Sequence, residues 1–418
     1  MKHVDVVIIG GSLAGAACAR ELARQGIDAI AFDRDRFPRE KVCGGFVSPG
    51  AVDLLDELEV LEAVKAAGAT QVRSSRIRIG GREIPVELPR HGLGISRRTL
   101  DAVMADHAAV QQGFVRDVKR AGEEFRVQLE EREVSARVVV DAAGKLSRFS
   151  RRRAVPQFGV QFYETETRGE VLDFWFFEDG YGGAVTVEGG RTNACFLVDK
   201  DALVGFVGAW GNPSDLRHPG NLGQPGHPRD LGDPGHPGDL GHPGDLGSLR
   251  RSSSGEPESQ ASGFCPPESG GQRGPIGSRE GRFLSGRCEH ASLEPPPVQA
   301  RSLLHKPEYL VTGPLAFDTL SSDFISIGDA AGMVDPFCGE GMRHALETGM
   351  LAATIIADGL NRGDSYATMR AGYTQQSERR WRGKRTLGKI IRHMLKHPRV
   401  TSIALGLNPE YWFRKLWD

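Results

Sequence analysis

The chain has 418 residues, which is long enough for two or three domains around a large hydrophobic core, and its formal net charge is −1. The chain as a whole lacks the positive charge that attracts the phosphates of nucleic acid, so we expect no nucleic-acid partner. The six cysteines are scattered without metal-ligand spacing, and no charged-then-apolar segment precedes the first predicted strand, which favours a cytoplasmic protein without a metal site.

The first predicted elements are a strand, a glycine-rich turn and a helix. An apolar run over residues 4–9 precedes Gly10-Gly11-Ser12-Leu13-Ala14-Gly15, and a helical pattern continues to Gln25. Unpaired N–H groups at such a helix start can bind a pyrophosphate if side chains do not intervene. A second apolar run, 27–32, ends in Asp33, at the spacing where an acid accepts ribose hydroxyls. The pattern predicts a dinucleotide-binding turn in which Ser12 replaces the second glycine.

Three further segments follow in the same half of the chain. Residues 36–45 are basic, contain a proline and end in Cys43-Gly44-Gly45. Residues 96–101, Ser-Arg-Arg-Thr-Leu-Asp, resemble a helix start. An apolar strand pattern over 138–140 leads into Asp141-Ala142-Ala143-Gly144.

The next segment is strand-rich. Residues 171–177 form an aromatic strand, and runs over 184–187 and 192–198 flank a glycine-containing turn, which predicts an antiparallel hairpin. The aromatic run Phe174-Trp175-Phe176-Phe177 has two interpretations, the lining of a substrate pocket or an ordinary half-buried core strand.

A low-complexity region over 211–297 interrupts this second domain. A six-residue unit of the type His-Pro-Gly-Asp-Leu-Gly recurs there, beginning at His218, His227, His236 and His242. Proline in every unit blocks helix and ladder pairing, and one leucine in six cannot build a core, so we predict a disordered insertion. Metal binding by the four histidines is the alternative, and it would carry a large ordering entropy.

The last third of the chain repeats the strand, turn and helix pattern. A strand-like run over 324–327 precedes Gly328-Asp329-Ala330-Ala331-Gly332, and a turn over 333–342 leads into a helix to about residue 357. Near the end, Lys384–His397 is a basic amphipathic helix. It has two interpretations, contact with an anionic membrane surface or packing of its apolar stripe on the body of the protein. No run approaches the roughly 20 apolar residues of a membrane span.

Together, the turns at 10–15 and 328–342 resemble the FAD-dependent oxidoreductase superfamily of geranylgeranyl reductases, aromatic-ring hydroxylases and flavin halogenases. The Cys43-Gly44-Gly45 segment resembles the geranylgeranyl reductase branch. This resemblance implies an α/β fold: a Rossmann-like FAD-binding domain of the para-hydroxybenzoate hydroxylase type (GR2-type) and an antiparallel-sheet substrate domain. The expected divisions are a discontinuous FAD domain over 1–153 and 310–380 that shares some sheet elements with the substrate domain, a substrate domain over 154–210 and 298–317, the 211–297 insertion, and a helical segment over 381–418.

The resemblance also implies which residues bind the cofactor, FAD. Asp329 would bond the ribityl chain, Arg97 would reach the cofactor from its helix start, and residues 336–342 would lie beside the pyrimidine edge of the flavin. The implied FAD-binding residues are Gly10, Gly11, Ser12, Ala14, Gly15, Asp33, Arg34, Arg97, Val115, Gly328, Asp329, Pro336, Gly339, Gly341 and Met342.

The reaction implied by the reductase branch is reduction of a double bond in a small hydrophobic, polyprenyl-type substrate, with hydride from reduced flavin. The electron donor would be NAD(P)H or a reduced protein carrier. Cys43 and Tyr181 are the candidate catalytic residues, and a disulfide between Cys43 and Cys338 is an alternative role for that cysteine.

Two departures keep other functions open. Ala143 stands where hydroxylases usually carry an aspartate, and the Tyr-x-Trp-x-Phe-Pro motif of the reductase branch is only half present, from Tyr181 to Thr186. The alternatives are an FAD monooxygenase acting on an aromatic or polyketide-like substrate, and a flavin-free binding protein, which Ser12 and Ala143 motivate. The Trp-x-Trp-x-Ile-Pro segment of halogenases is absent from the sequence, which disfavours a halogenase.

Overall fold

The computed structural model describes residues 2–79, 82–177, 180–203, 206, 216–217, 309–313, 315–336 and 339–395. The insertion predicted over 211–297 therefore lies outside the described residues, apart from the pair 216–217. Cys338 and the end of the predicted helix 384–397 also lie outside them.

The first sheet has seven strands in the order β6-β2-β1-β9-β8-β7, with β18 paired to β9. Strands β1, β2, β9 and β18 are parallel, so their carboxyl ends meet at one edge, where a doubly wound sheet binds its ligand. The strands are β1 Lys2–Ile9, β2 Ala29–Asp33, β6 Gln111–Gln112, β7 Asp117–Ala121, β8 Glu124–Gln128, β9 Glu133–Asp141 and β18 Ile325–Ser326.

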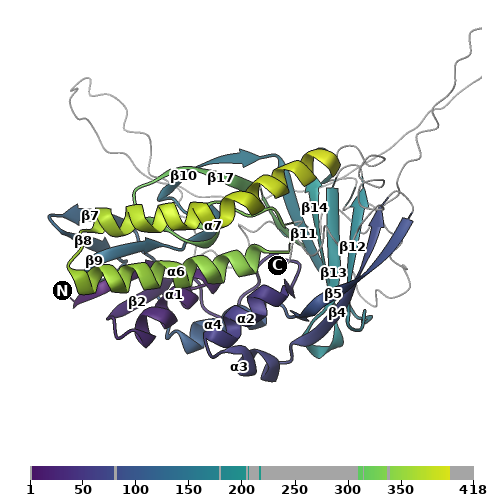
Figure 1. Cartoon of the computed structure of the whole chain (residues 1–418), viewed down its shortest axis with the longest axis horizontal. Helices are drawn as coiled ribbons and strands as arrows, with labels where there is room; N and C mark the ends of the chain where they lie inside the picture. Colours follow the sequence, from purple (N-terminus) through teal and green to yellow (C-terminus); the bar gives the residue numbers. More distant parts are fainter. Residues whose placement is uncertain are drawn as a thin grey trace, which may run out of the picture. The chain divides into compact units, whose positions relative to one another are not determined.

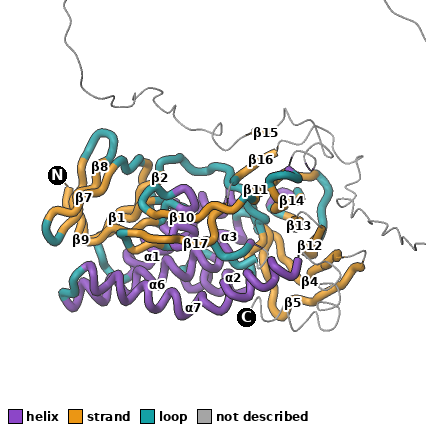
Figure 2. Tube along the Cα trace, turned by 90° about the horizontal axis from the view of Figure 1, so that it is seen from above, coloured by secondary structure: helices purple, strands orange, loops and turns teal. Residues whose placement is uncertain are grey.

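Helices from both ends of the chain pack beside this sheet. Helix α1 contacts α6, and α6 contacts α7, although α1 is separated from the other two by three hundred residues of sequence. Figures 1 and 2 show these three helices side by side. The helices are α1 Leu13–Arg24, α2 Pro49–Glu57, α3 Leu61–Ala66, α4 Arg97–His107, α6 Gly341–Arg362 and α7 Tyr366–Leu395.

The second sheet has nine strands in the order β15-β16-β11-β14-β13-β12-β4-β5-β3. Its β13–β14 pair is the antiparallel hairpin that the sequence predicted. The strands are β3 Phe46–Val47, β4 Thr70–Ile79, β5 Arg82–Gly94, β11 Gln157–Glu164, β12 Val171–Phe177, β13 Gly180–Thr186, β14 Thr192–Asp199, β15 Leu216–Arg217 and β16 Tyr309–Thr312. A separate antiparallel pair joins β10 Ser150–Val155 to β17 Leu315–Ser322, and short 3-10 turns are η1 Gly144–Leu146, η2 Glu188–Gly190 and η5 Gly328–Ala331.

The second sheet draws strands from a range that the sequence placed within 1–153. The β4–β5 hairpin pairs through β4 with β12, in parallel, and β3 extends the sheet beyond β5. Ile77 and Ile79 on β4 alternate with arginines, so one face of the hairpin joins the core of the second sheet. The first 153 residues therefore contribute to both sheets.

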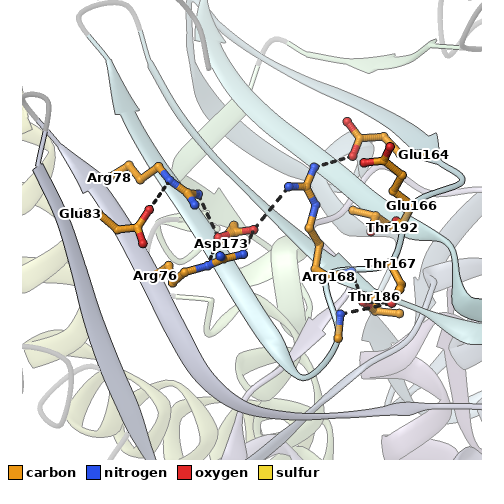
Figure 3. A network of polar contacts seen from close by, with 11 residues as sticks. Arg76, Arg78, Glu83, Glu164, Glu166, Thr167, Arg168, Asp173, Thr186 and Thr192 are labelled. Atoms are coloured by element: carbon orange, nitrogen blue, oxygen red, sulfur yellow. Dashed lines mark hydrogen bonds and ion pairs between the residues drawn. The ribbon is translucent and has the colours of Figure 1, made fainter. Parts of the chain in front are cut away.

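The two faces of the second sheet differ in chemistry. One face carries an apolar cluster that includes Ile77, Leu172, Phe174, Phe176, Tyr181 and Leu197, here called the inner cluster. On the other face, Arg76 donates to both carboxylate oxygens of the buried Asp173 at 2.9 and 3.1 Å, and Arg78 donates at 2.9 Å. Figure 3 shows this network across β4 and β12. The predicted aromatic run is thus divided, because Phe174 and Phe176 join the inner cluster whereas Trp175 packs on the opposite face.

Candidate functional site

In the turn after β1, the backbone packs closely against the backbone at the end of β9, at the carboxyl edge of the first sheet. Gly10 has φ +106°, and a Cβ placed on it would lie 2.4 Å from the carbonyl oxygen of Ala142 at the end of β9. A Cβ on Gly15 would lie 1.8 Å from the carbonyl oxygen of Gly10. Only glycine fits at these two positions. Helix α1 can therefore begin at this edge with its unpaired N–H groups toward a ligand.

Asp33 lies beside this turn at the end of β2. Its carboxylate is 5% exposed and accepts the backbone N–H of Gly11 at 2.8 Å, and the guanidinium of Arg39 lies 3.5 Å away. Arg34 has a half-exposed side chain, and Val115 is buried in the core of the first sheet. The structure thus places Asp33 beside the glycine turn and adds two partners that the sequence did not reveal, the Gly11 N–H and Arg39.

Ser12 has a partner set that the sequence did not reveal. Its hydroxyl donates to Asp101 Oδ2 at 2.7 Å and accepts from Arg97 Nη2 at 2.7 Å. Arg97 and Asp101, one turn apart on α4, form a two-point ion pair at 2.8 and 3.0 Å with both side chains buried. Burial alone would lower the pKa of Arg97, but the carboxylate raises it above its usual range, and the guanidinium lowers the pKa of Asp101. The serine therefore ties the turn to the Arg97 ion pair.

The distal turn lies against the proximal one. Gly328 has φ +57°, and a Cβ placed on it would lie 2.8 Å from Cβ of Ala14. Its N–H donates to Thr348 Oγ1 of α6 at 2.9 Å, which anchors η5 to that helix. Asp329, which is half-buried, follows in η5, and η5 contacts η1 at the end of β9. The two glycine turns thus meet at one edge of the first sheet.

The segment after η5 ends in the first turn of α6. Pro336 is exposed, Gly339 has φ +62°, and α6 begins at Gly341. Met342 is buried in a cluster with Leu13 of α1. The first N–H groups of a 22-residue helix are therefore available beside this turn, as the sequence predicted.

Cys43 lies on the inner face of the second sheet. Its backbone N–H donates to Gln161 Oε1 at 2.9 Å, and its carbonyl accepts from Asn193 Nδ2 at 2.9 Å. Cys195 pairs with Gln161 in register, so it projects from the same face. Burial, and then the neighbouring Cys43, raise the pKa of Cys195, which keeps that thiol protonated. The Cys43 segment is thus held on the second sheet by two side-chain amides.

Two lysines near the distal motif were missed at the sequence level. Burial, and then the positive charge of Arg97, lower the pKa of Lys41, whereas Asp329 opposes the shift. Burial lowers the pKa of Lys145 to about 8, again opposed by Asp329. Lys145 also contacts Thr312 Oγ1. Only their positions in the sequence could have pointed to these lysines, since Lys41 stands two residues before Cys43 and Lys145 directly follows Gly144.

Tyr181 and Asp335 form a buried hydrogen bond between the second sheet and the segment that precedes α6. The phenol of Tyr181 donates to Asp335 Oδ1 at 2.6 Å, and the two residues are 6% and 4% exposed. The sequence identified Tyr181 but gave no partner for it. The bond joins β13 to the turn before α6.

Helix α7 packs the first part of the predicted basic segment onto the body. Lys384 donates to the buried Glu340 at 3.0 Å, Arg385 donates to the carbonyl of Ala331 at 3.4 Å, and Leu387 packs against the inner cluster. Ile390 is 51% exposed. The interpretation that this segment packs on the body of the protein is therefore confirmed for Lys384, Arg385 and Leu387. Across the described ranges, we find no helix whose length and apolar content would let it cross a membrane.

A buried histidine lies behind the distal turn, and the sequence did not single it out. His344 is 0% exposed, and its ring meets Trp381 edge to face at 4.6 Å. Neither ring nitrogen has a hydrogen-bond partner among the described residues. Burial, and then the charge of Arg385, lower the pKa of His344 to about 3, so the ring is neutral at ordinary pH.

The residues at this edge fit an FAD. The glycine positions allow close backbone approach, and Asp33 and Asp329 stand at the proximal and distal turns. The cations Lys41 and Lys145 both interact with Asp329, and Lys41 also interacts with Asp101, which is paired with Arg97. These cations would attract the negative charges of a pyrophosphate. Among the described residues, no group of three or more His, Cys, Asp or Glu side chains could hold a metal ion.

Comparison with known proteins agrees with this fit. Residues 3–154 match the family model of the FAD binding domain. A 1H-pyrrole-2-carbonyl-[peptidyl-carrier protein] brominase of Pseudoalteromonas luteoviolacea is 27% identical over 40% of this chain and 43% of its own. A menaquinone reductase of Mycolicibacterium smegmatis is 36% identical over 22% of this chain and 21% of its own. The chain thus matches less than half the length of either curated relative.

A solved structure shows the same architecture over nearly the full length. PqsL of Pseudomonas aeruginosa, named a probable FAD-dependent monooxygenase, is 14% identical with a TM-score of 0.65 over 96% of this chain and 98% of its own. At this identity the likeness concerns the fold. Residues 3–154 are therefore similar to an FAD binding domain, and the chain has the para-hydroxybenzoate hydroxylase-like FAD-binding fold.

Proposed function

We propose that this FAD-dependent protein reduces a double bond of a small hydrophobic substrate of the polyprenyl class. The observation that carries the proposal is the placement of Cys43-Gly44-Gly45 on the inner face of the second sheet, where Gln161 and Asn193 hold the backbone of Cys43. A Cβ placed on Gly45, which has φ +75°, would lie 2.7 Å from Asn193 Nδ2. The motif shared with the reductase branch is therefore built into the sheet proposed to bind substrate.

The inner face of that sheet suits an apolar substrate. Leu172, Phe174 and Phe176 form its buried cluster, and burial of apolar surface is the main favourable term for binding a prenyl chain. The relative that is a menaquinone reductase supports this class through its local identity of 36%, against 27% for the brominase.

The roles proposed for this chain's residues are positioning and proton supply. FAD, when bound and reduced, supplies hydride, with NAD(P)H or a reduced protein carrier as the electron donor. Cys43 and Tyr181 are the side chains that we propose as proton donors to the substrate, since both lie on the inner face. The backbone N–H groups in the first turn of α6 would stabilise negative charge on the flavin ring beside this turn.

An oxygen-using reaction is the second candidate. The brominase match covers 40% of this chain, a longer stretch than the reductase match, and it favours a flavin monooxygenase or halogenase. The absence of the Trp-x-Trp-x-Ile-Pro segment weighs against the halogenase.

A single anaerobic experiment separates the two candidates. Pre-reduced enzyme without oxygen is incubated with a naphthoquinone that carries a polyprenyl side chain, and the product is then exposed to air so that any quinol returns to quinone. A gain of two hydrogens that survives this oxidation lies in the side chain and supports the reductase. A product that forms only in the presence of oxygen, or a brominated product formed with oxygen and bromide, would contradict the reductase and support the oxygen-using reaction.

We further propose peripheral membrane contact through the outer side of Lys384–His397. Lys384, Arg385 and Leu387 contact the body, whereas Lys389 and Ile390 are exposed, which places a cation next to an apolar side chain as in helices that lie on anionic surfaces. Co-sedimentation with vesicles of anionic phospholipid tests this contact. Binding that is unchanged in Lys389→Glu/Ile390→Ser would contradict it.

A further inference from the structure

The Tyr181–Asp335 hydrogen bond connects the inner face of the second sheet to the turn before α6. Tyr181 belongs to the inner cluster, and its hydroxyl donates to Asp335 Oδ1 at 2.6 Å in a buried setting. A bond of this length from O–H to carboxylate is of the short, charge-assisted kind, which holds its geometry more firmly than a neutral pair. The position of the phenol oxygen therefore depends on the position of Asp335.

Helix α7 holds Asp335 from another direction. A Cβ placed on Gly388 would lie 2.9 Å from Cβ of Asp335, closer than side-chain carbons normally approach. On the same helix, Lys384 bonds Glu340 and Arg385 bonds Ala331, so α7 contacts this turn on both sides of Asp335 in the sequence. The glycine lets the helix lie against the carboxylate-bearing residue.

We infer that Asp335 is a positioning residue for the Tyr181 hydroxyl, and that α7 fixes Asp335 through its contact at Gly388. The inference rests on the proposed function, in which Tyr181 faces the substrate. Because Asp335 accepts the O–H of Tyr181, the carboxylate fixes the place from which the phenol meets the substrate, and Tyr181 gives up its proton to the substrate only when the O–H turns away from Asp335. The carboxylate thus sets how Tyr181 meets the substrate.

Four variants and one matched control test this arrangement. Tyr181→Phe removes the donor, Asp335→Ala removes the acceptor, and Asp335→Asn keeps a side-chain acceptor of the same shape. Gly388→Ala pushes on Asp335 without changing either partner of the bond. Gly383→Ala is the control, because Gly383 lies on the same helix and a Cβ there meets nothing within 4 Å. Both glycine variants gain the same helix propensity, so they differ in the contact with Asp335.

We expect Tyr181→Phe, Asp335→Ala and Gly388→Ala each to lower kcat by about tenfold for the prenylated naphthoquinone, with KM within about twofold. Asp335→Asn should recover part of this loss, and Gly383→Ala should match the wild type. In a Tyr181→Phe background, Gly388→Ala should add no further loss, because both act through one hydrogen bond. A role in folding alone would move the melting temperature and leave the kcat-to-KM pattern unchanged.

Two results would overturn the inference: Gly388→Ala behaving like Gly383→Ala, or losses that multiply in the Tyr181→Phe/Gly388→Ala double variant. The absorption spectrum of bound FAD gives a second readout for the same double-variant cycle, and it needs no substrate. If no side-chain double bond is reduced, the proposed function fails, and the spectral cycle still decides the inference. Non-additive spectral shifts support the coupling, and additive or absent shifts reject it.

Discussion

Gly328 of the distal turn lies directly against Ala14 of the proximal turn, where an added Cβ would come within 2.8 Å of the alanine Cβ. The first residues of α1 and the start of η5 therefore form one surface, although the chain separates them by three hundred residues. We predict that Gly328→Ala lowers FAD affinity at least about tenfold, because both the contact and the φ of +57° resist a side chain.

Gly363→Ala is the control for backbone strain. Gly363 has φ +75° at the end of α6, but a Cβ there meets nothing within 4 Å. This variant should lose stability by about 1 kcal/mol and keep the FAD affinity of the wild type. Equal FAD affinity in the two variants, measured by fluorescence titration, would show that contact between the turns is irrelevant to binding.

The buried pair Arg97–Asp101 should be far more costly to break than an exposed pair. Asp101→Ala leaves a buried guanidinium without its carboxylate, so we predict a loss of about 3–5 kcal/mol in the free energy of unfolding. Asp53→Ala removes a carboxylate from the Arg90 pair, in which the side chains are 54% and 57% exposed, and should cost less than about 1 kcal/mol. Urea denaturation of both variants checks the contrast, and similar losses would contradict it.

His344 should make the protein sensitive to acid. The unfolded chain binds a proton on this ring below about pH 6.5, whereas the folded chain does not until about pH 3. The unfolded state therefore holds more protons in this window, and stability falls as pH falls, by about 1.4 kcal/mol per unit.

His344→Phe keeps an aromatic ring against Trp381 and removes the titrating group. Melting curves between pH 4 and 7 should show a shallower pH dependence for this variant than for the wild type. Parallel curves would mean that the ring does not titrate in this way.

FAD binding should weaken as Lys145 loses its proton. Burial lowers the pKa of Lys145 to about 8, so the ammonium that faces Asp329 is lost as the pH rises through that value. We predict a several-fold rise in the FAD dissociation constant between pH 7 and 9.5. Lys145→Arg keeps the charge over this range and should remove the rise. The same rise in both proteins would assign the effect to another group.

The sequence predicted the local elements of this fold better than the contacts between them. The strands β1 and β9 and the helices α1 and α6 follow from apolar periodicity and from glycine at the turns. Parallel pairing of β4 with β12 was not predictable, because the alternation of β4 fits any sheet edge with one apolar face.

The same limit applies to the site. The positions of Gly10, Asp33 and Gly328 follow from motif spacing, which is a property of consecutive residues. The bonds of Arg97 to Ser12 and of Tyr181 to Asp335 join residues 85 and 154 positions apart, and such pairs arise from tertiary packing. Lys145 and His344 acquire their shifted pKa values from burial, which no local pattern specifies.

The most direct test of this account is identification of the flavin released from the purified protein, alongside the Asp329→Ala variant. The account predicts FAD at about one per chain in the wild type and a lower content in the variant, with Asp358→Ala, at an exposed position on α6, unchanged. A protein that is colourless, and stays so after incubation with FAD, would contradict the account and favour a flavin-free binding protein on the same fold.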